Sequence, residues 1–218
     1  MTYGPRAIKR GVWDKEYRDN KWDFADNTMG DCVYPHLEKH AKNGSILDMG
    51  CGSGNTATEL AESAYHSYVG VDISAVALAK AMKRTRESGR QGKNSFACSD
   101  FLAYQPTETF DVILFRESIY HVPLGKVKDV LDHYSAYLKE GGVIMVRLFA
   151  GSLETSTSKY RPNAMLAIME AEFDVVERTQ YPDAGLPTVI VFRPKIAATT
   201  ELSVENQRLR KTSQAVSQ

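Results

Sequence analysis

Short apolar runs alternate with amphipathic stretches from about residue 44 onward. The runs are rich in β-branched side chains, which favour extended backbone, and the stretches between them repeat apolar residues every three or four positions, which favours helices. This alternation is typical of βα units packed into a mostly parallel sheet. Strands are predicted at 45–50, 67–73, 94–100, 110–116 and 141–149.

Two of the predicted helices have a recognisable buried face. Ser74 is placed to cap the first of them, and its apolar positions at i, i+3, i+4 and i+7 are Ala75, Leu78, Ala79 and Met82. The second lies between the fourth and fifth strands, and its inward positions are Val127, Val130, Leu131, Tyr134 and Leu138. We expect this second helix to run as far as Gly141 and Gly142, because glycine ends helices.

The pattern changes after residue 150, where a polar stretch precedes a short predicted helix at about 162–171. Two strand-like runs then follow each other closely, at 173–181 and 187–193. A parallel crossover needs about a dozen residues or more, so these two strands cannot both be parallel to the rest. One of them should run antiparallel at the sheet edge.

The composition is that of one globular domain: 218 residues, 43% apolar and 25% charged. The 27 basic and 27 acidic residues cancel, so no overall field attracts nucleic acid or an anionic membrane. No apolar run is long enough to cross a bilayer, and the charged N-terminus is unlike a signal peptide, so we expect a cytoplasmic protein. The 3 cysteines lack metal-ligand spacing, which predicts reduced thiols and no metal site.

Three segments are expected along the chain. A helical lid or cap segment occupies residues 1–43, the main domain occupies 44–194, and a polar tail occupies 195–218. The tail has scattered apolar residues without a sustained period, which predicts a flexible extension; a docking helix at ELSVENQRLRK is the alternative.

A glycine-rich turn follows the first predicted strand, with the sequence Asp48-Met49-Gly50-Cys51-Gly52-Ser53-Gly54-Asn55. Glycines let the backbone approach a ligand at the carboxyl end of a strand, where open α/β sheets bind their ligands. The dinucleotide-binding pattern would need a third glycine at the position of Asn55. Instead, the spacing G-x-G-x-G with an acid two residues earlier resembles motif I of the class I S-adenosylmethionine-dependent methyltransferases.

The resemblance covers roughly residues 44–193. It implies a single Rossmann-like three-layer α/β sandwich, with a mostly parallel seven-stranded sheet and one antiparallel edge strand. It also implies that S-adenosyl-L-methionine is the cofactor and S-adenosyl-L-homocysteine the product, with methyl transfer to an oxygen, nitrogen or possibly carbon of a small metabolite by in-line displacement. The sequence contains no metal-ligand cluster, which predicts a reaction without a metal.

Acids at the ends of successive strands carry the implied cofactor contacts. The resemblance implies that Asp72 accepts the ribose hydroxyls, that Asp100 accepts the adenine amine, and that Asp48 faces the methionyl amino group. It also implies that Ile73 and Phe101 flank the adenine. For Asp72 and Asp100, a solvated strand end or a helix cap is the alternative. The other residues expected at the cofactor are Gly50, Cys51, Gly52, Gly54, Asn55, Phe115, Arg116, Trp13 and Tyr17.

The segment after the fourth strand should hold the reacting groups. His121 is a candidate general base because histidine titrates near neutral pH; a hydrogen-bonded, orienting role is the alternative. Tyr120 and Glu117 are further candidates for catalysis through contact with the substrate.

Aromatic residues among charges mark the segment ahead of the sheet. Trp13, Tyr17 and Trp22 resemble the segment that closes over cofactor and substrate in small members of the family, with Trp22 on the substrate side. A helix that simply packs its aromatic residues against the sheet is the alternative.

Arginines near the ends of the fourth and fifth strands bear on the substrate. Arg116 and Arg147 would be costly to desolvate without an anion, so an acidic metabolite is one hypothesis, with Arg147 in substrate binding. Pairing of the arginines with a protein acid such as Glu117 is the alternative.

Two other functions compete with small-molecule methylation. Amino-methylating enzymes for nucleic-acid bases carry an Asn/Asp-Pro-Pro-Tyr-like motif, where this chain has Phe115-Arg116-Glu117-Ser118, and the net charge is zero. Methylation of nucleic acid or protein is therefore the second hypothesis, and a non-catalytic cofactor-binding subunit is the third. We expect a small-molecule substrate, no nucleic-acid or membrane partner, and a monomer or homodimer.

Overall fold

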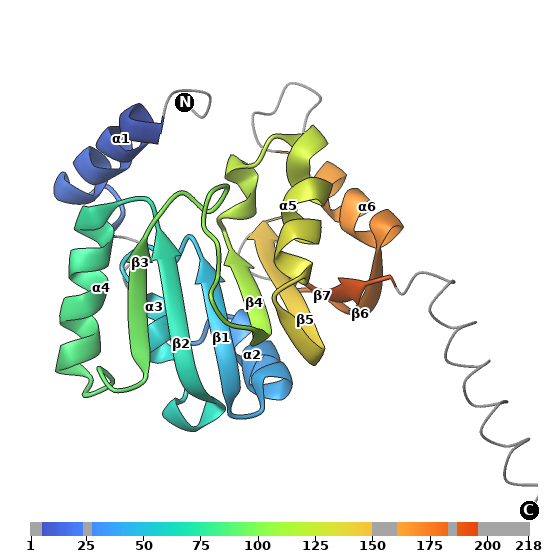
Figure 1. Ribbon diagram of the computed structural model, residues 1–218, viewed down its shortest axis with the longest axis horizontal. Coiled ribbons are helices and arrows are strands. Elements are labelled where there is room, and N and C mark those ends of the chain that lie inside the picture. Colours follow the sequence, from blue (N-terminus) through green and yellow to red (C-terminus); the bar gives the residue numbers. More distant parts are fainter. Residues whose placement is uncertain (1–5, 24–27, 150–160, 183–186, 196–218) are drawn as a thin grey trace, which may run out of the picture.

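The computed structural model describes residues 6–23, 28–149, 161–182 and 187–195. Its centre is a seven-stranded sheet in the order β3-β2-β1-β4-β5-β7-β6, flanked by helices (Figure 1). The strands are β1 (Gly44–Met49), β2 (Tyr65–Asp72), β3 (Asn94–Cys98), β4 (Phe110–Arg116), β5 (Leu138–Phe149), β6 (Phe173–Gln180) and β7 (Pro187–Pro194). The α-helices are α1 (Arg6–Arg18), α2 (Val33–Ala41), α3 (Asn55–Glu59), α4 (Ala75–Glu87), α5 (Val127–Ser135) and α6 (Pro162–Glu172).

The strand directions follow the sequence prediction. β1 pairs in parallel with β2 and β4, so that Leu47 lies opposite Val69 on one side and Ile113 on the other. β3 and β5 extend the parallel sheet, and β7 is antiparallel to both of its neighbours. The three-layer, mostly parallel fold is confirmed. Its antiparallel strand, β7, lies one place in from the edge, because the chain turns back after β6 and inserts between β6 and β5.

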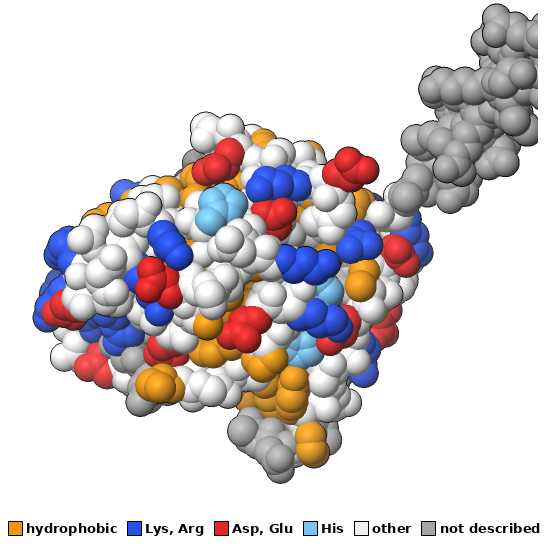
Figure 2. Space-filling model, turned by 90° about the horizontal axis from the view of Figure 1, so that it is seen from below, with side chains coloured by type: hydrophobic (Ala, Val, Ile, Leu, Met, Phe, Trp, Pro, Cys, Tyr) orange, Lys and Arg blue, Asp and Glu red, His pale blue; other side chains and the backbone are white. Residues whose placement is uncertain are grey.

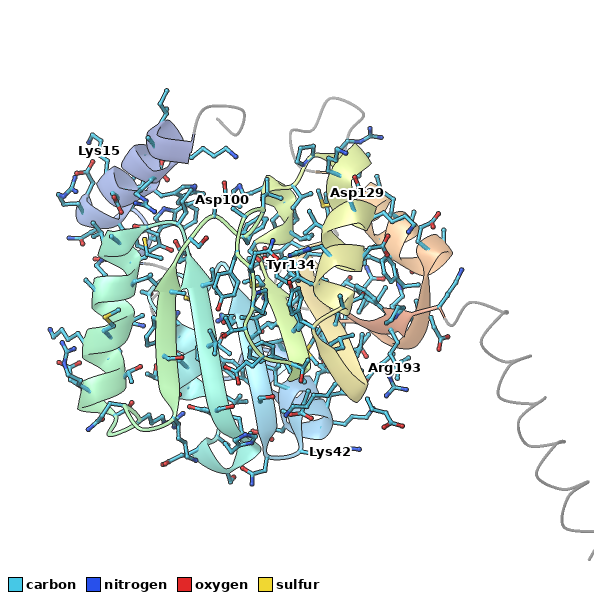
Figure 3. The ribbon with its side chains drawn as sticks, viewed as in Figure 1. Lys15, Lys42, Asp100, Asp129, Tyr134 and Arg193 are labelled. Carbon is cyan, nitrogen blue, oxygen red and sulfur yellow. The ribbon has the colours of Figure 1, made fainter. Side chains whose placement is uncertain are left out.

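Helices cover both faces of the sheet, so both faces are buried. Successive side chains of a strand point to opposite faces and therefore enter different cores. Along β4, Ile113 and Phe115 belong to the core beneath α5 and α6, where the rings of Phe115 and Tyr134 meet at 5.7 Å. Figure 3 labels Tyr134 at the centre of this layer. Leu114 belongs to the opposite core, which α2 covers with Leu37 among its buried side chains. α2 is therefore part of the main core, although it precedes the first strand.

The helix α4 buries a different face from the one predicted. Ser74 does cap it, since its Oγ accepts a hydrogen bond from the Ala77 N–H at 3.1 Å. The buried side, however, is made by Ala77, Leu78, Ala81 and Thr85, whereas Met82 is 41% exposed. The small alanines face inward because α4 packs closely against the glycine turn.

The helix α5 is shorter than predicted. It ends at Ser135, and Leu138 already belongs to β5, opposite Phe110 of β4. Pairing with the neighbouring strand thus takes precedence over the helical spacing of Leu138. The register shifts between Phe110 and Val112, close to where Gly141 has a left-handed backbone with φ of 75°.

Two observations concern the molecular surface. None of the helices in the described ranges combines the length and apolarity needed to cross a membrane. Figure 2 shows the molecule from below the view of Figure 1, and on this face basic and acidic side chains are interspersed without a broad region of either charge. This face therefore lacks the extended basic surface that nucleic-acid binding uses.

Residues 196–218, nearly all of the predicted tail, lie outside the described residues.

Candidate active site

A cavity of about 230 Å³ lies at the end of the sheet where the parallel strands finish. Asp48, Asp72 and Asp100, which stand at or just beyond the ends of β1, β2 and β3, all line it. Figure 3 shows Asp100 at this end of the sheet, below α1. The remaining lining residues are Lys9, Trp13, Tyr17, Trp22, Gly50, Cys51, Gly52, Ser53, Asn55, Thr56, Ile73, Phe101, Leu102, Arg116, Glu117, Ser118 and His121.

The glycine turn brings its backbone close to the end of β4 and to α1. Its glycines have positive φ angles of 83°, 55° and 79° at Gly50, Gly52 and Gly54, which other residues rarely adopt. A β-carbon at Gly50 would lie 2.5 Å from the Ser118 β-carbon, and one at Gly52 would lie 2.7 Å from the Tyr17 hydroxyl. The positive φ angles and these close approaches together favour glycine where the turn meets the end of β4 and α1.

Asp72 links the glycine turn to the start of α4. Its Oδ2 accepts a hydrogen bond from the Gly52 N–H at 2.9 Å, and its Oδ1 accepts one from the Ser74 N–H at 2.8 Å. Burial raises the pKa of Asp72 to about 6, against the lowering effect of these two bonds. Because each carboxylate oxygen has more than one acceptor site, the side chain retains capacity for ligand hydroxyls on its cavity side.

Asp48 and Ser118 each contribute to the cavity wall a buried polar atom that has no hydrogen-bond partner within the described part of the chain. Asp48 is 1% exposed, and its Oδ2 accepts the Tyr68 hydroxyl at 2.6 Å, whereas its Oδ1 has no partner. Burial raises the pKa of Asp48. The Ser118 hydroxyl is the second such atom, on a side chain from a residue only 5% exposed. Leaving such atoms without partners costs about 1–3 kcal/mol each, so both favour a polar ligand group.

Asp100 has a partner on the first helix. Its Oδ2 lies 3.8 Å from Lys9 Nζ, and its Oδ1 accepts a hydrogen bond from the Leu102 N–H at 3.0 Å. The next residue, Phe101, packs edge-to-face against Phe115 with 6.3 Å between ring centroids. The end of β3 thus places a carboxylate beside an aromatic wall.

The helix α1 lies over the cavity and is held there by hydrogen bonds to the residues that follow β2. Asp14 Oδ1 accepts hydrogen bonds from the Ser74 hydroxyl at 2.7 Å and from the Val76 N–H at 3.2 Å, so Asp14 adds a second cap to α4. Arg10 Nε donates to the Ile73 carbonyl at 3.2 Å. These bonds join α1 to the residues directly after β2.

An aromatic cluster lines the cavity beneath α1. The ring of Trp13 lies 6.4 Å from that of Tyr17 and 5.4 Å from that of Trp22. It also meets the His121 ring edge-to-face at 5.0 Å. This cluster joins the N-terminal segment to the end of β4.

The backbone is strained where β4 ends. Glu117 has φ of 54°, in the left-handed region that costs a non-glycine residue about 1–2 kcal/mol. Burial raises the pKa of the Glu117 carboxyl, although the nearby Arg147 opposes this. Strain of this kind is typical of functional positions.

Four charged side chains form a continuous chain of ion pairs at the ends of β4 and β5. Arg116 Nη2 lies 3.1 Å from Asp31 Oδ2, and Arg147 Nε lies 3.5 Å from Asp31 Oδ1. Arg147 Nη1 continues the chain to Glu117 Oε1 at 2.5 Å. Two arginines and two acids cancel, so both guanidinium groups are neutralised by the protein itself.

Most of the predicted site residues line the cavity, but four do not. Gly54 faces α4, where its β-carbon would lie 2.7 Å from that of Ala81, and Phe115 is fully buried in the core. The Tyr120 hydroxyl accepts a hydrogen bond from the Phe149 N–H. Arg147 is held in the ion-pair chain.

The cavity also includes residues that the sequence analysis did not single out. Lys9 lies one helical turn before Trp13 on α1, so the two side chains share a face of the helix. The helical spacing from Trp13 could therefore have identified Lys9 as a cavity residue. Ser53, Thr56, Leu102 and Ser118 are neighbours of predicted residues. Asp31 carried no recognisable signal, because its partners are distant in sequence.

Comparison with known proteins identifies the family. Residues 21–184 match the family described as methyltransferase domain. The chain belongs to this family. A curated relative, the ubiquinone biosynthesis O-methyltransferase of Xylella fastidiosa, is 31% identical over 180 residues, which is 74% of this chain and 68% of the relative.

Other relatives match over shorter regions. Phosphoethanolamine N-methyltransferase 2 of Caenorhabditis elegans is 25% identical over 54% of this chain and 26% of the relative. Thiocyanate methyltransferase 1 of Brassica oleracea is 32% identical over 50% of this chain and 48% of the relative. The chain thus spans between about a quarter and a half of the length of these two relatives.

Solved structures share the fold. The N-methyltransferase NodS from Bradyrhizobium japonicum, in complex with S-adenosyl-L-homocysteine, superposes with a TM-score of 0.67 at 18% identity, covering 86% of this chain and 98% of that one. The 1,6-didemethyltoxoflavin-N1-methyltransferase from Burkholderia thailandensis has a TM-score of 0.66 at 18% identity, over 87% and 88% of the two chains.

Proposed function

We propose that this protein is an S-adenosylmethionine-dependent methyltransferase that acts on a small molecule in the cytoplasm. The observation that carries the proposal is one cavity in which Asp48, Asp72 and Asp100, at the ends of three neighbouring strands, meet the glycine turn. Family membership and the shared fold support it.

The residues of the cavity fit this cofactor. Asp48 Oδ1 is a buried acceptor without a partner in the described ranges, which suits a cationic amino group. Gly52 leaves room that a β-carbon would fill, Asp72 would accept the ribose hydroxyls, and Asp100 would accept the adenine amine beside Phe101. When bound, the cofactor would supply an activated methyl group on a sulfonium.

The protein's own residues then have two tasks. The aromatic cluster of Trp13, Tyr17 and Trp22 would exclude water and offer ring faces to a cation. The end of β4, at Glu117 and His121, would orient the acceptor behind the methyl group. Catalysis would come mainly from proximity, because a well-oriented pair of reactants needs little further activation.

The acceptor is proposed to be small because the cavity is confined. The helix α1 covers it, with Lys9, Trp13 and Tyr17 among the lining residues. The names of the relatives support the same class, since they describe methylation of small compounds such as thiocyanate and phosphoethanolamine.

Transfer of a labelled methyl group tests the proposal. The protein should move label from methyl-labelled S-adenosylmethionine into the small-molecule fraction of a metabolite extract. The Asp72→Asn variant should lose most of this transfer, whereas Asp174→Asn, which changes an exposed acid on β6, should retain it. Label in the macromolecular fraction would instead support nucleic-acid or protein methylation, and absence of any transfer would contradict the proposal.

A further inference from the structure

Within the ion-pair chain, Glu117 is the member most open to the cavity. Its side chain is 32% exposed, compared with 6% for Asp31, 10% for Arg147 and 13% for Arg116. Asp31 has one oxygen on each arginine, its Oδ1 also accepts the Val33 N–H at 2.9 Å, and it does not line the cavity. Glu117 lines the cavity, whereas Arg147 and Tyr120 lie outside the lining. Arg147 holds Oε1 of Glu117, and the Tyr120 side chain also hydrogen-bonds the Glu117 carboxylate.

Among the described residues, the cavity lining offers no ready cationic partner for an anionic acceptor. In the part of the chain that the structure describes, the lysine and arginine side chains of the lining are Lys9 and Arg116. Lys9 faces Asp100 at 3.8 Å, and Arg116 faces Asp31 at 3.1 Å. An oxygen acceptor that must ionise before attack would place its negative charge beside Glu117 without such a cation, which is unfavourable.

The same surroundings favour a positively charged acceptor. Glu117 presents a carboxylate, and Trp13 and Trp22 present aromatic rings, to the same cavity. Carboxylates and ring faces both attract ammonium groups. We infer that the acceptor is an amine, that Glu117 is the catalytic residue that receives its N–H, and that Arg147 and Asp31 position Glu117. This inference rests on the proposed function.

The proton balance of the step assigns a role to Glu117. An ammonium nitrogen has no lone pair, so the Glu117 carboxylate first takes one proton from it. The nitrogen lone pair then forms the bond to the methyl carbon as the carbon–sulfur bond breaks, and the sulfur keeps that bond's electrons. The products are a methylated ammonium and the neutral thioether S-adenosylhomocysteine, and Glu117 returns its proton to water. Burial raises the pKa of Glu117, which makes it a better proton acceptor.

A pair of cofactor analogues tests the inference without knowledge of the acceptor. In sinefungin, a carbon replaces the sulfur and an amine replaces the methyl group. S-adenosylhomocysteine keeps the sulfur but carries no group in place of the methyl. Titration calorimetry should show that Glu117→Gln weakens sinefungin by about tenfold or more while S-adenosylhomocysteine changes little, because one charge-assisted hydrogen bond is lost. Glu140→Gln, at an exposed position of β5, should change neither affinity.

The positioning role has its own readout in the ratio of the two affinities. Arg147→Met should lower the preference for sinefungin, and Arg147→Lys should restore most of it. An equal fall for both ligands would leave Arg147 with a structural role only and overturn its positioning role. If Glu117→Gln affects both ligands equally or neither, the assignment of Glu117 is overturned, whereas failure of the wild-type protein to bind either ligand would contradict the proposed function itself.

A chemical treatment of the extract tests the acceptor class directly. Acylation of its amines with an N-hydroxysuccinimide ester should abolish label transfer, while alkylation of its thiols with iodoacetamide should leave transfer unchanged. Transfer that survives amine acylation would overturn the inference and leave the methyltransferase proposal intact.

Discussion

Cofactor binding should depend on pH through Asp72. Its pKa of about 6 in the ligand-free protein means that the carboxyl is about half protonated at pH 6. Ribose hydroxyls donate to the ionised form, so binding should lower this pKa and release a proton. The sign is therefore fixed: affinity rises as pH increases through 6. At pH 5 only about one-tenth of the carboxyl is ionised, so affinity should be about tenfold lower than at pH 8, or about 1.4 kcal/mol.

Titration calorimetry with S-adenosylhomocysteine measures this dependence. Titrations between pH 5 and 8, each in two buffers of different ionisation enthalpy, give both the affinity and the number of protons released. Asp48 and Glu117 also have raised pKa values, so a variant must assign the effect. Asp72→Asn should bind more weakly at pH 8 and lose most of the pH dependence, whereas Asp174→Asn should behave like the wild type.

Stability of the ligand-free protein gives the opposite slope. Because folding raises the pKa of Asp72 above its ordinary value of about 3.9, ionisation opposes folding, and this contribution to stability is lost as pH rises from about 4 to 6.

An affinity that stays constant from pH 5 to 8, or a pH dependence that persists unchanged in Asp72→Asn, would refute the assignment of Asp72 to the ribose.

Two further substitutions test the turn and the cap. Gly52→Ala would place a β-carbon 2.7 Å from the Tyr17 hydroxyl at a φ of 55°, so calorimetry should show about tenfold weaker binding of S-adenosylhomocysteine. Gly92→Ala is the control, because a β-carbon at Gly92 would lie in open space. Equal affinities of the two variants would contradict the close approach of the turn to the ligand. Asp14→Ala removes the second cap of α4 and should lower the free energy of unfolding by about 1 kcal/mol in urea denaturation, with faster hydrogen exchange in α1. Unchanged exchange there would show that these bonds do not fasten the helix.

The strands and the presence of an antiparallel strand near the sheet edge were accessible to sequence analysis, because β-branched runs mark strands and a short connection cannot join parallel ones. The helix faces were less accessible. Met82 fits the helical period as well as Ala81 does, and only the glycine turn packed against α4 decides in favour of the smaller side chain. Likewise, Leu138 fits the period of α5, but pairing with Phe110 draws it into β5.

Within the site, predictability depended on distance along the chain. Asp72 and Asp100 follow apolar runs, so their position at the same sheet edge could be expected from the alternation of strands and helices. Asp31 could not be found in this way, because it meets Arg116 and Arg147 only after residues 85 and 116 positions away are brought to the carboxyl ends of β4 and β5. The hypothesis that the arginines await an anionic substrate omitted this partner.

The left-handed backbone at Glu117 sets stability against chemistry at a single position. Glycine adopts that conformation without steric cost, so Glu117→Gly would relieve strain of about 1–2 kcal/mol while deleting the carboxylate. Selection for heat resistance alone would favour the glycine only if this relief exceeds the loss of the ion pair with Arg147, whereas selection for methyl transfer would retain the acid. A library at position 117 sorted by both criteria therefore measures which of the two contributions to stability is larger.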